Sequence, residues 1–147
     1  MAPTGKQRDI APGTYGSASS ISCKLAIYLY KEEVGRHFLD NYAYFELIGP
    51  TGHLRSDQCC AFVGYWGPGL FYPAHHHASE ELFFVLAGHT LFESDGDCPA
   101  TLGLATHRFH ASQQPHAMTT TDSAILTLVL WRGANLTGLS QLVKTHR

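Results

Sequence analysis

Three side chains that can bind a metal ion, His75, His77 and Glu81, lie close together in the middle of the chain. His75 and His77 are two residues apart, so their side chains point to the same face of an extended strand. Glu81 follows His77 at an even spacing and can share that face where the chain stays extended. Two imidazole nitrogens and one carboxylate oxygen form part of a ligand shell for a divalent ion such as Zn, Fe, Mn or Ni, with positions left open for a substrate. The alternative is a fortuitous run of surface histidines, but the strand-like apolar segments around it and the spacing of Glu81 argue against this.

A fourth ligand is expected from a strand further along the chain. His116 is the preferred candidate, because Pro115 immediately before it fixes the local backbone. His110 is the next candidate, either as an alternative ligand or as a residue that contacts a ligand. Three further histidines are expected to point away from the site or to lie at the surface: His76, His89 and His107.

Short strand-like runs surround these residues and must position them. They are Tyr44–Ile48, Cys60–Trp66, Glu81–Leu86, Thr90–Glu93, Thr106–His110 and Ala124–Trp131. Clusters of Gly, Pro, Asp and Ser separate most of these runs, and a turn is expected at Ala87-Gly88. Many short strands at near-regular spacing indicate an antiparallel sandwich or jelly roll. A single helix is predicted within residues 30–41, where apolar residues recur at roughly helical intervals.

Composition predicts one globular domain and argues against two classes of partner. The 147 residues are 44% hydrophobic and 15% charged, with a formal net charge of −2. No basic stretch occurs, so neither nucleic acid nor an anionic membrane surface is an expected partner. Residues 1–20 are expected to form a flexible arm and residues 21–147 the domain. No apolar signal segment or zinc-type cysteine spacing is seen, so reduced thiols and a cytoplasmic location are expected.

The segment from Gly69 to Gly88 reads G-x5-H-x-H-x3-E-x6-G. This spacing resembles the first sequence motif of the cupin superfamily at every fixed position. The resemblance implies an all-β cupin jelly-roll barrel, to which the N-terminal arm and the short helix would be added.

A closer resemblance appears when four segments are considered together. They are Tyr72–Leu82, Leu86–Gly88, Pro115–Thr120 and Leu130–Gly133. Together they resemble the cupin-type dimethylsulfoniopropionate (DMSP) lyases. Such enzymes use a bound divalent metal and a tyrosine base to remove the proton alpha to a carboxylate, releasing dimethyl sulfide and acrylate. The resemblance implies the ligands His75, His77, Glu81 and His116.

The resemblance also implies roles for two aromatic residues and shows one departure. Tyr72 would be a catalytic tyrosine, although simple strand alternation would turn it away from His75 unless the chain bends at Pro73. Trp131 would be an aromatic wall of the substrate pocket, suited to a cationic group; a place in the core is the alternative for it. The family has a second tyrosine two residues after the ligand glutamate, where this chain has Phe83. Phe83 is therefore predicted to line the pocket, and Phe84, on the opposite face, to lie in the core.

Three functions remain open from the sequence. The first is a metal-dependent lyase, or a related isomerase or cyclase, that acts on a small carboxylate. The second is an Fe(II)-dependent dioxygenase, because three histidines and a glutamate can also hold iron for oxygen chemistry. The third is a non-catalytic cupin that binds a metal or ligand. A small-molecule substrate and a divalent metal of unresolved identity are expected, and a homodimer is possible.

Overall fold

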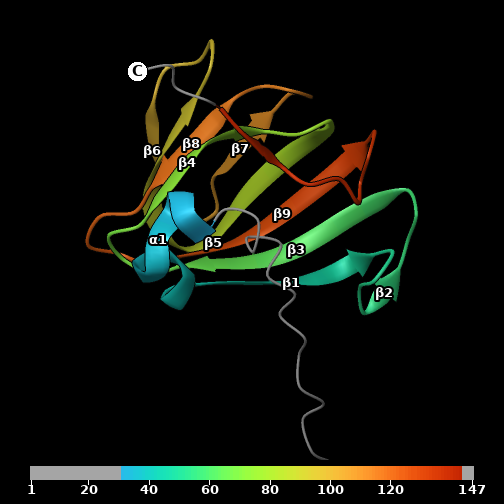
Figure 1. The fold of residues 1–147 in the computed structure, drawn as a ribbon, viewed down its shortest axis with the longest axis horizontal. Helices are drawn as coiled ribbons and strands as arrows, with labels where there is room; N and C mark the ends of the chain where they lie inside the picture. The colour runs from blue at the N-terminus through green and yellow to red at the C-terminus, as the bar shows by residue number, and fades with distance from the viewer. Residues whose placement is uncertain (1–30, 144–147) are drawn as a thin grey trace, which may run out of the picture.

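Two packed β-sheets form the body of the molecule (Figure 1). The computed structural model describes residues 31–143. The first sheet has the strand order β2 (Leu54–Arg55), β1 (Tyr42–Gly49), β3 (Cys59–Trp66), β9 (Ile125–Gly133) and β5 (Ser79–Ser94), followed by β7 (His107–His110). The second has the order β10 (Gln141–Leu142), β4 (Phe71–His76), β8 (His116–Thr119) and β5, followed by β6 (Ala100–Gly103). All pairings except β1 with β2 are antiparallel, which confirms the predicted all-β jelly roll.

Strand β5 belongs to both sheets and links them. Its first half pairs with β7 and β9, and its second half pairs with β6 and β8. The turn predicted at Ala87-Gly88 is wrong, because the ladder with β9 continues through both residues after a register shift that follows Val85. Gly88 has a φ of 77°. Glycine adopts this backbone conformation without steric cost, so the strand changes sheets here without ending.

Most of the other predicted strands are confirmed with small changes in their ends. The sequence did not predict β2, β6, β8 and β10, which are only two to four residues long. Such short strands carry too little alternation to be recognised, and tertiary pairing defines them.

Helix α1 (Lys31–Asp40) confirms the helix predicted within residues 30–41. Gly35 has non-helical backbone angles, so the helix is kinked there. Its last turn ends where the side-chain amide of Asn41 donates to the carbonyl oxygen of His37 at 2.9 Å. Phe38 is buried and its ring lies 5.5 Å from that of Tyr72, so the helix packs against one wall of the site described below.

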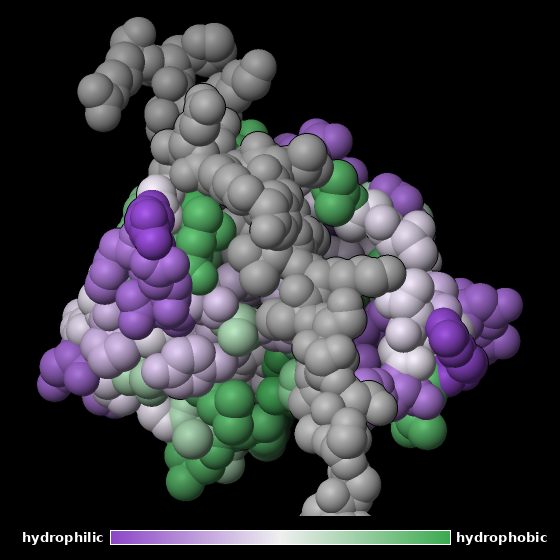
Figure 2. All heavy atoms as spheres, turned by 60° about the horizontal axis from the view of Figure 1, so that its bottom comes forward, coloured by the Kyte–Doolittle hydropathy of each residue, from purple (hydrophilic) through white to green (hydrophobic). Residues whose placement is uncertain are grey.

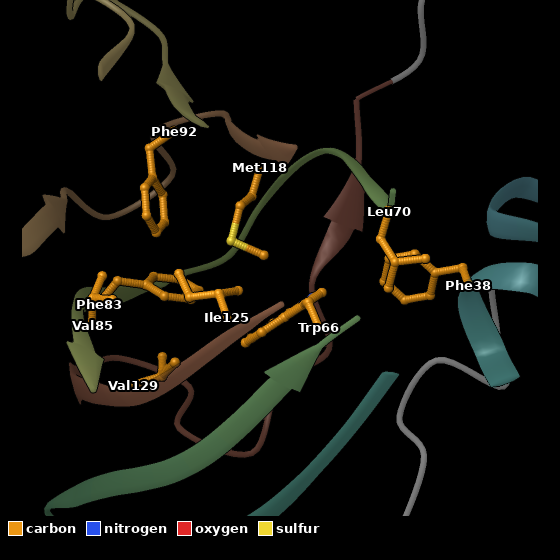
Figure 3. Close-up of a cluster of buried hydrophobic side chains, with 9 residues drawn as sticks. All are labelled: Phe38, Trp66, Leu70, Phe83, Val85, Phe92, Met118, Ile125 and Val129. Atoms are coloured by element: carbon orange, nitrogen blue, oxygen red, sulfur yellow. The ribbon is translucent and has the colours of Figure 1, made fainter. Parts of the chain in front are cut away.

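The hydrophobic core lies between the two sheets (Figure 3). Its buried members are Phe38, Trp66, Leu70, Phe83, Val85, Phe92, Met118, Ile125 and Val129. Phe83 belongs to this cluster and also lines a cavity, as described below. The prediction that Phe84 lies in the core is wrong, because this side chain is only half-buried and is not part of the cluster.

The outer face of the first sheet carries exposed hydrophobic side chains. Phe109 and Leu130 both lie opposite Leu82 in the strand ladders, so the three share the face that points away from the core. Tyr65 and Leu86 are also exposed. Figure 2 shows that hydrophobic side chains gather on one part of the surface, beside flanks that are mainly polar.

Three further features of the chain are the N-terminal arm, the cysteines and the length of its helix. The predicted arm, residues 1–20, lies outside the described residues. Among the described cysteines, Cys59, Cys60 and Cys98 are all free thiols, in line with the expectation of reduced cysteines. In residues 31–143, no helix has the length and apolar character needed to cross a membrane.

Candidate metal centre and active site

The four predicted metal ligands meet between the two sheets. His75 and His116 lie directly opposite each other on β4 and β8. His77 follows the end of β4, and Glu81 comes from the half of β5 that belongs to the first sheet. All four side chains are buried, at 3–5% exposure. The ligand atoms of the three histidines lie within 4.8 Å of one another, so residues far apart in the sequence form one compact cluster.

Each of the three histidines is anchored through one ring nitrogen to a backbone carbonyl. The Nδ1 atoms of His75, His77 and His116 lie 2.8–2.9 Å from the carbonyl oxygens of Pro73, Ser79 and Gln114, respectively. A carbonyl oxygen can only accept, so each Nδ1 carries the proton and donates it. In the neutral ring, each Nε2 then keeps a lone pair, which is the form that binds a metal.

Glu81 accepts hydrogen bonds on both of its carboxylate oxygens. Trp131 Nε1 donates to Oε1 at 2.7 Å, and His110 Nδ1 lies 2.9 Å from Oε2. His116 Nε2 lies 3.1 Å from the same Oε2. Burial opposes the charged carboxylate, but the hydrogen bond from His110 and the close approach of His116 and His77 outweigh this and hold the pKa of Glu81 well below its usual range. Glu81 is therefore ionised at neutral pH.

Burial and the Glu81 carboxylate act in opposite directions on the pKa values of the buried histidines. Burial, together with the neighbouring His116, lowers the pKa of His75 to about 3, so its ring is neutral. For His116, burial lowers the pKa, but the adjacent Glu81 carboxylate more than offsets this and raises it. The Nε2 atoms of His77 and His116 are buried without a hydrogen-bond partner. Buried polar atoms rarely lack a partner, so these nitrogens, facing one carboxylate, fit a bound divalent cation.

Tyr72 lies beside the cluster despite its odd spacing from His75. The ladder between β4 and β8 shifts register between these two residues, so simple alternation does not hold. The ring centroids of Tyr72 and His75 are only 4.2 Å apart. The register shift spans Pro73, where a bend was needed to bring Tyr72 to this side, and Tyr72 lines the same cavity as His75 and Glu81.

Phe83 and Trp131 also line this cavity. The ring of Phe83 contacts Trp66 at a centroid distance of 5.9 Å. Trp131 packs against the ring of His77 at 4.3 Å and bonds to Glu81 through its indole nitrogen. Trp131 is thus both a cavity wall and a hydrogen-bond donor, and only the first of these was anticipated from the sequence.

The cavity has a volume of about 570 Å³, which suits a small organic ligand. His75 and Glu81 contribute polar groups to it, and residues 136–140 form part of its wall. Aromatic side chains form another part: Tyr42, Tyr44, Phe62, Trp66, Tyr72 and Trp131. Glu46 also lines it and was not predicted. The alternation of side chains along β1 could have placed Glu46 on the cavity side only if the pairing of β1 with β3 had been known.

The other histidines considered in the sequence lie in different environments. His110 is buried and reaches Glu81, in agreement with its expected place next to a ligand. His76 points elsewhere, with Nδ1 2.6 Å from the side-chain oxygen of Gln113. His89 and His107 are exposed, as predicted.

Comparison with known proteins identifies relatives of the whole cluster-bearing region. Residues 24–127 match the family model of dimethylsulfoniopropionate lyase. The chain is 45% identical to dimethylsulfoniopropionate lyase DddQ of Ruegeria pomeroyi strain DSS-3 over 100 residues, which are 68% of this chain and 50% of that protein. The chain therefore spans about half the length of the curated relative it matches.

Solved structures show the same relationship. A crystal structure from a study of the DMSP lyases RdDddP and RnDddQII superimposes with a TM-score of 0.75 at 46% identity, covering 78% of this chain and 58% of that one. DddQ from Ruegeria pomeroyi DSS-3 gives a TM-score of 0.71 at 43% identity, covering 75% and 55%. A cupin-like protein from Thermotoga maritima shares the fold alone, with a TM-score of 0.60 at 12% identity over 70% and 76% of the two chains. Because the family model matches well over half of the sequence, the chain belongs to the DMSP lyase family, and its fold is that of a cupin.

Proposed function

We propose that the chain is a metal-dependent lyase that cleaves DMSP, or a closely similar small carboxylate, by removal of a proton and elimination. The observation that carries this proposal is the buried cluster of His75, His77, Glu81 and His116 at a cavity with aromatic walls. Membership of the family supports the reaction type. The cavity walls suit a cationic group, because aromatic ring faces attract cations.

The metal ion would be held by His75, His77, Glu81 and His116, and when bound it would stabilise negative charge on the substrate carboxylate. Several divalent ions suit this donor set, and Zn, Fe, Mn and Ni all remain candidates. The chain's own residues bind and orient the substrate. The aromatic walls enclose its cationic end and exclude water from the reacting atoms.

Tyr72 is the proposed base. Its phenolate oxygen takes the proton from the carbon alpha to the carboxylate, and the electron pair of that C–H bond becomes the new carbon–carbon double bond. The bond from the beta carbon to sulfur breaks, and its electron pair leaves with dimethyl sulfide. Acrylate is the second product, and Tyr72 then returns its proton to solvent. Phe83 has no group that can exchange a proton, so it shapes the pocket.

The direct test measures dimethyl sulfide released from DMSP by the purified chain, with and without a chelator, under anaerobic conditions. We expect release that a chelator abolishes and that added Zn²⁺ or Mn²⁺ restores. In parallel, elemental analysis should find one metal per chain, and His77→Ala or Glu81→Ala should lose it while circular dichroism still shows a β-rich fold. The matched control is His107→Ala, because His107 is exposed and lies outside the cluster.

Three results would contradict the proposal in different ways. Full metal occupancy in the His77→Ala and Glu81→Ala variants would reject the ligand assignment. Turnover that strictly requires Fe(II) and oxygen would instead support a dioxygenase, which the same three-histidine, one-glutamate donor set can serve. Tight ligand binding without any turnover would support a non-catalytic binding protein.

Partners and location are also proposals. We expect a small molecule as the substrate, no role for nucleic acid or membranes, and a cytoplasmic protein. A homodimer stays possible, and the exposed hydrophobic residues on the outer face of the first sheet are compatible with it. Light scattering at several protein concentrations would test the oligomeric state.

A further inference from the structure

Strand register places a hydrogen-bond donor on each side of Glu81. In the first sheet, β5 lies between β7 and β9, and Glu81 is directly opposite His110 on one neighbour and Trp131 on the other. Residues directly opposite in antiparallel strands share a face and lie within side-chain contact. Glu81, His110 and Trp131 therefore lie side by side on the inner face of the sheet. The glutamate is in the middle, and each neighbour carries a ring N–H group.

Each flanking residue makes the same pair of contacts. His110 Nδ1 bonds to Oε2 of Glu81 at 2.9 Å, and its ring stacks on His116 with centroids 4.0 Å apart and planes 10° apart. Trp131 Nε1 bonds to Oε1 at 2.7 Å, and its ring lies 4.3 Å from that of His77. Each residue thus fixes one carboxylate oxygen and supports one ligand histidine at the same time.

We propose that His110 and Trp131 form a brace that sets the orientation of Glu81 toward the metal. A carboxylate held at both oxygens cannot rotate about its terminal bond. Each of its oxygens also faces a ligand nitrogen: Oε1 lies 3.4 Å from His77 Nε2, and Oε2 lies 3.1 Å from His116 Nε2. Partners that orient a metal ligand in this way commonly change metal affinity about 10- to 100-fold when removed. This inference rests on the proposed metal site.

The contacts favour a brace over two other roles. His110 could itself be a metal ligand, because it forms with Glu81 and His116 a second group of side chains that could hold an ion. However, the atom with which it reaches this carboxylate is Nδ1, which is already bonded to Glu81. The rings of Phe83 and Phe92 lie 5.9 and 6.5 Å from its own ring. Trp131 could act only as a cavity wall, but its indole nitrogen makes a 2.7 Å bond to a buried carboxylate. A wall alone would not need that bond. Both are therefore positioning residues.

The test compares metal affinity in variants that remove each N–H and largely keep the ring. His110→Phe and Trp131→Phe should each weaken Co²⁺ and Zn²⁺ binding about 10- to 100-fold in competition with a chelating indicator. His110→Asn should recover most of the affinity, because the asparagine amide can place a donor near the position of Nδ1. His107→Phe is the matched control on the same strand, and its affinity should equal that of the parent.

The visible absorption of bound Co²⁺ separates a brace from a ligand. Removing a brace should leave the number of ligands unchanged, so the intensity of the Co²⁺ bands should stay in the range of the parent. Intensity that indicates a lost ligand in His110→Phe would overturn the brace and make His110 a ligand. Unchanged affinity in both His110→Phe and Trp131→Phe would also overturn it. A parent chain that binds neither ion would overturn the brace together with the proposed function.

Thermal unfolding of the metal-free variants checks that each variant is folded. If His110→Phe does not fold, the test rests on Trp131→Phe and His110→Asn.

Discussion

At the scale of single residues, the ability of the site to bind a metal depends on which atom of each side chain already makes a hydrogen bond. Backbone carbonyls hold the Nδ1 atoms of the three ligand histidines, which leaves Nε2 for a metal. Two N–H donors hold Glu81, so it is charged and oriented even without a metal. Tyr72 is the tyrosine whose ring lies against a ligand histidine, at 4.2 Å from His75. The cluster is therefore preorganised, which is what metal binding and fast proton transfer both require.

Replacement of Tyr72 by Phe tests its role as the base. The change removes only the hydroxyl group, and the ring can keep its packing against Phe38 and His75. We expect metal content to stay at the parent level and turnover to fall by about 100-fold or more, the usual scale for a positioned acid–base group. Turnover of DMSP and metal content are the two measurements. Near-normal turnover would reject the role and leave Tyr72 as a packing residue.

Phe83→Tyr tests whether the missing second tyrosine limits the reaction. Phe83 lines the cavity, so a new hydroxyl would face the substrate. We expect dimethyl sulfide release to rise by about 100-fold or more, because a positioned proton-transfer group contributes on this scale. Phe84→Tyr is the control, since this neighbour lies on the opposite face and is half-buried. Equal rates in the parent and Phe83→Tyr would show that Tyr72 alone suffices.

At the scale of elements, strand β5 determines the geometry of the site. Its first half presents Glu81 from one sheet, and its second half pairs with the strand that carries His116. The change of sheet occurs around Gly88, where the main chain approaches β9 very closely. A Cβ atom at Gly88 would overlap the carbonyl oxygen of Ala124. The relative position of the two ligands therefore depends on this one glycine.

Gly88→Ala should destabilise the fold more than a similar change elsewhere. Gly88 and Gly96 have nearly equal φ angles, 77° and 81°. Alanine at either position costs about 1–2 kcal/mol for the left-handed backbone. Only Gly88 adds a steric overlap, since a Cβ at Gly96 meets nothing within 4 Å. Urea unfolding of the two variants should therefore give a clearly lower free energy of unfolding for Gly88→Ala, and equal losses would contradict the account of the bend.

At the scale of the whole molecule, the jelly roll buries a group of histidines between its two sheets, away from solvent. Burial lowers the pKa of both His75 and His110. Such groups are neutral in the folded chain but take up protons once the chain unfolds. Without a metal, the stability of the protein must then depend on pH, because the unfolded state binds more protons than the folded state.

The metal-free protein should lose stability as pH falls from about 6.5 toward 3. His75 has an ordinary pKa of 6.5 and a folded pKa of about 3, so its contribution is complete above 6.5 and is lost across that range. The lowered pKa of Glu81 acts in the same direction at acidic pH, whereas the raised pKa of His116 opposes it. Urea unfolding of chelator-treated protein at pH 7, 6, 5 and 4 measures the effect.

His75→Gln should make this pH dependence shallower, because the buried titrating group is gone. His107→Gln is the control, since His107 is exposed and should leave the slope as in the parent. An unchanged slope in His75→Gln would mean that other groups cause the pH dependence.

The sequence by itself determined the type of fold and which residues to propose as ligands. The even spacing of His75, His77 and Glu81 places their side chains on one face by strand alternation alone. Short strand-like runs separated by turn residues are enough to indicate a jelly roll. Pro115 marked His116 as a candidate for the same reason. These features could be predicted because each depends on residues that are close together along the chain.

Only the tertiary structure decided which residues face one another across strands. The sequence suggested a turn at Ala87-Gly88, but pairing with β9 keeps β5 continuous there. Tyr72 reaches His75 because the β4–β8 ladder shifts register between them. The sequence showed only that a bend at Pro73 was needed, and the pairing with β8 decided that the irregularity forms. The two donors to Glu81 come from different strands that happen to be in register with it. A slip of one residue in either pairing would turn each donor to the other face of the sheet, so register, which long-range packing fixes, determines how Glu81 is held.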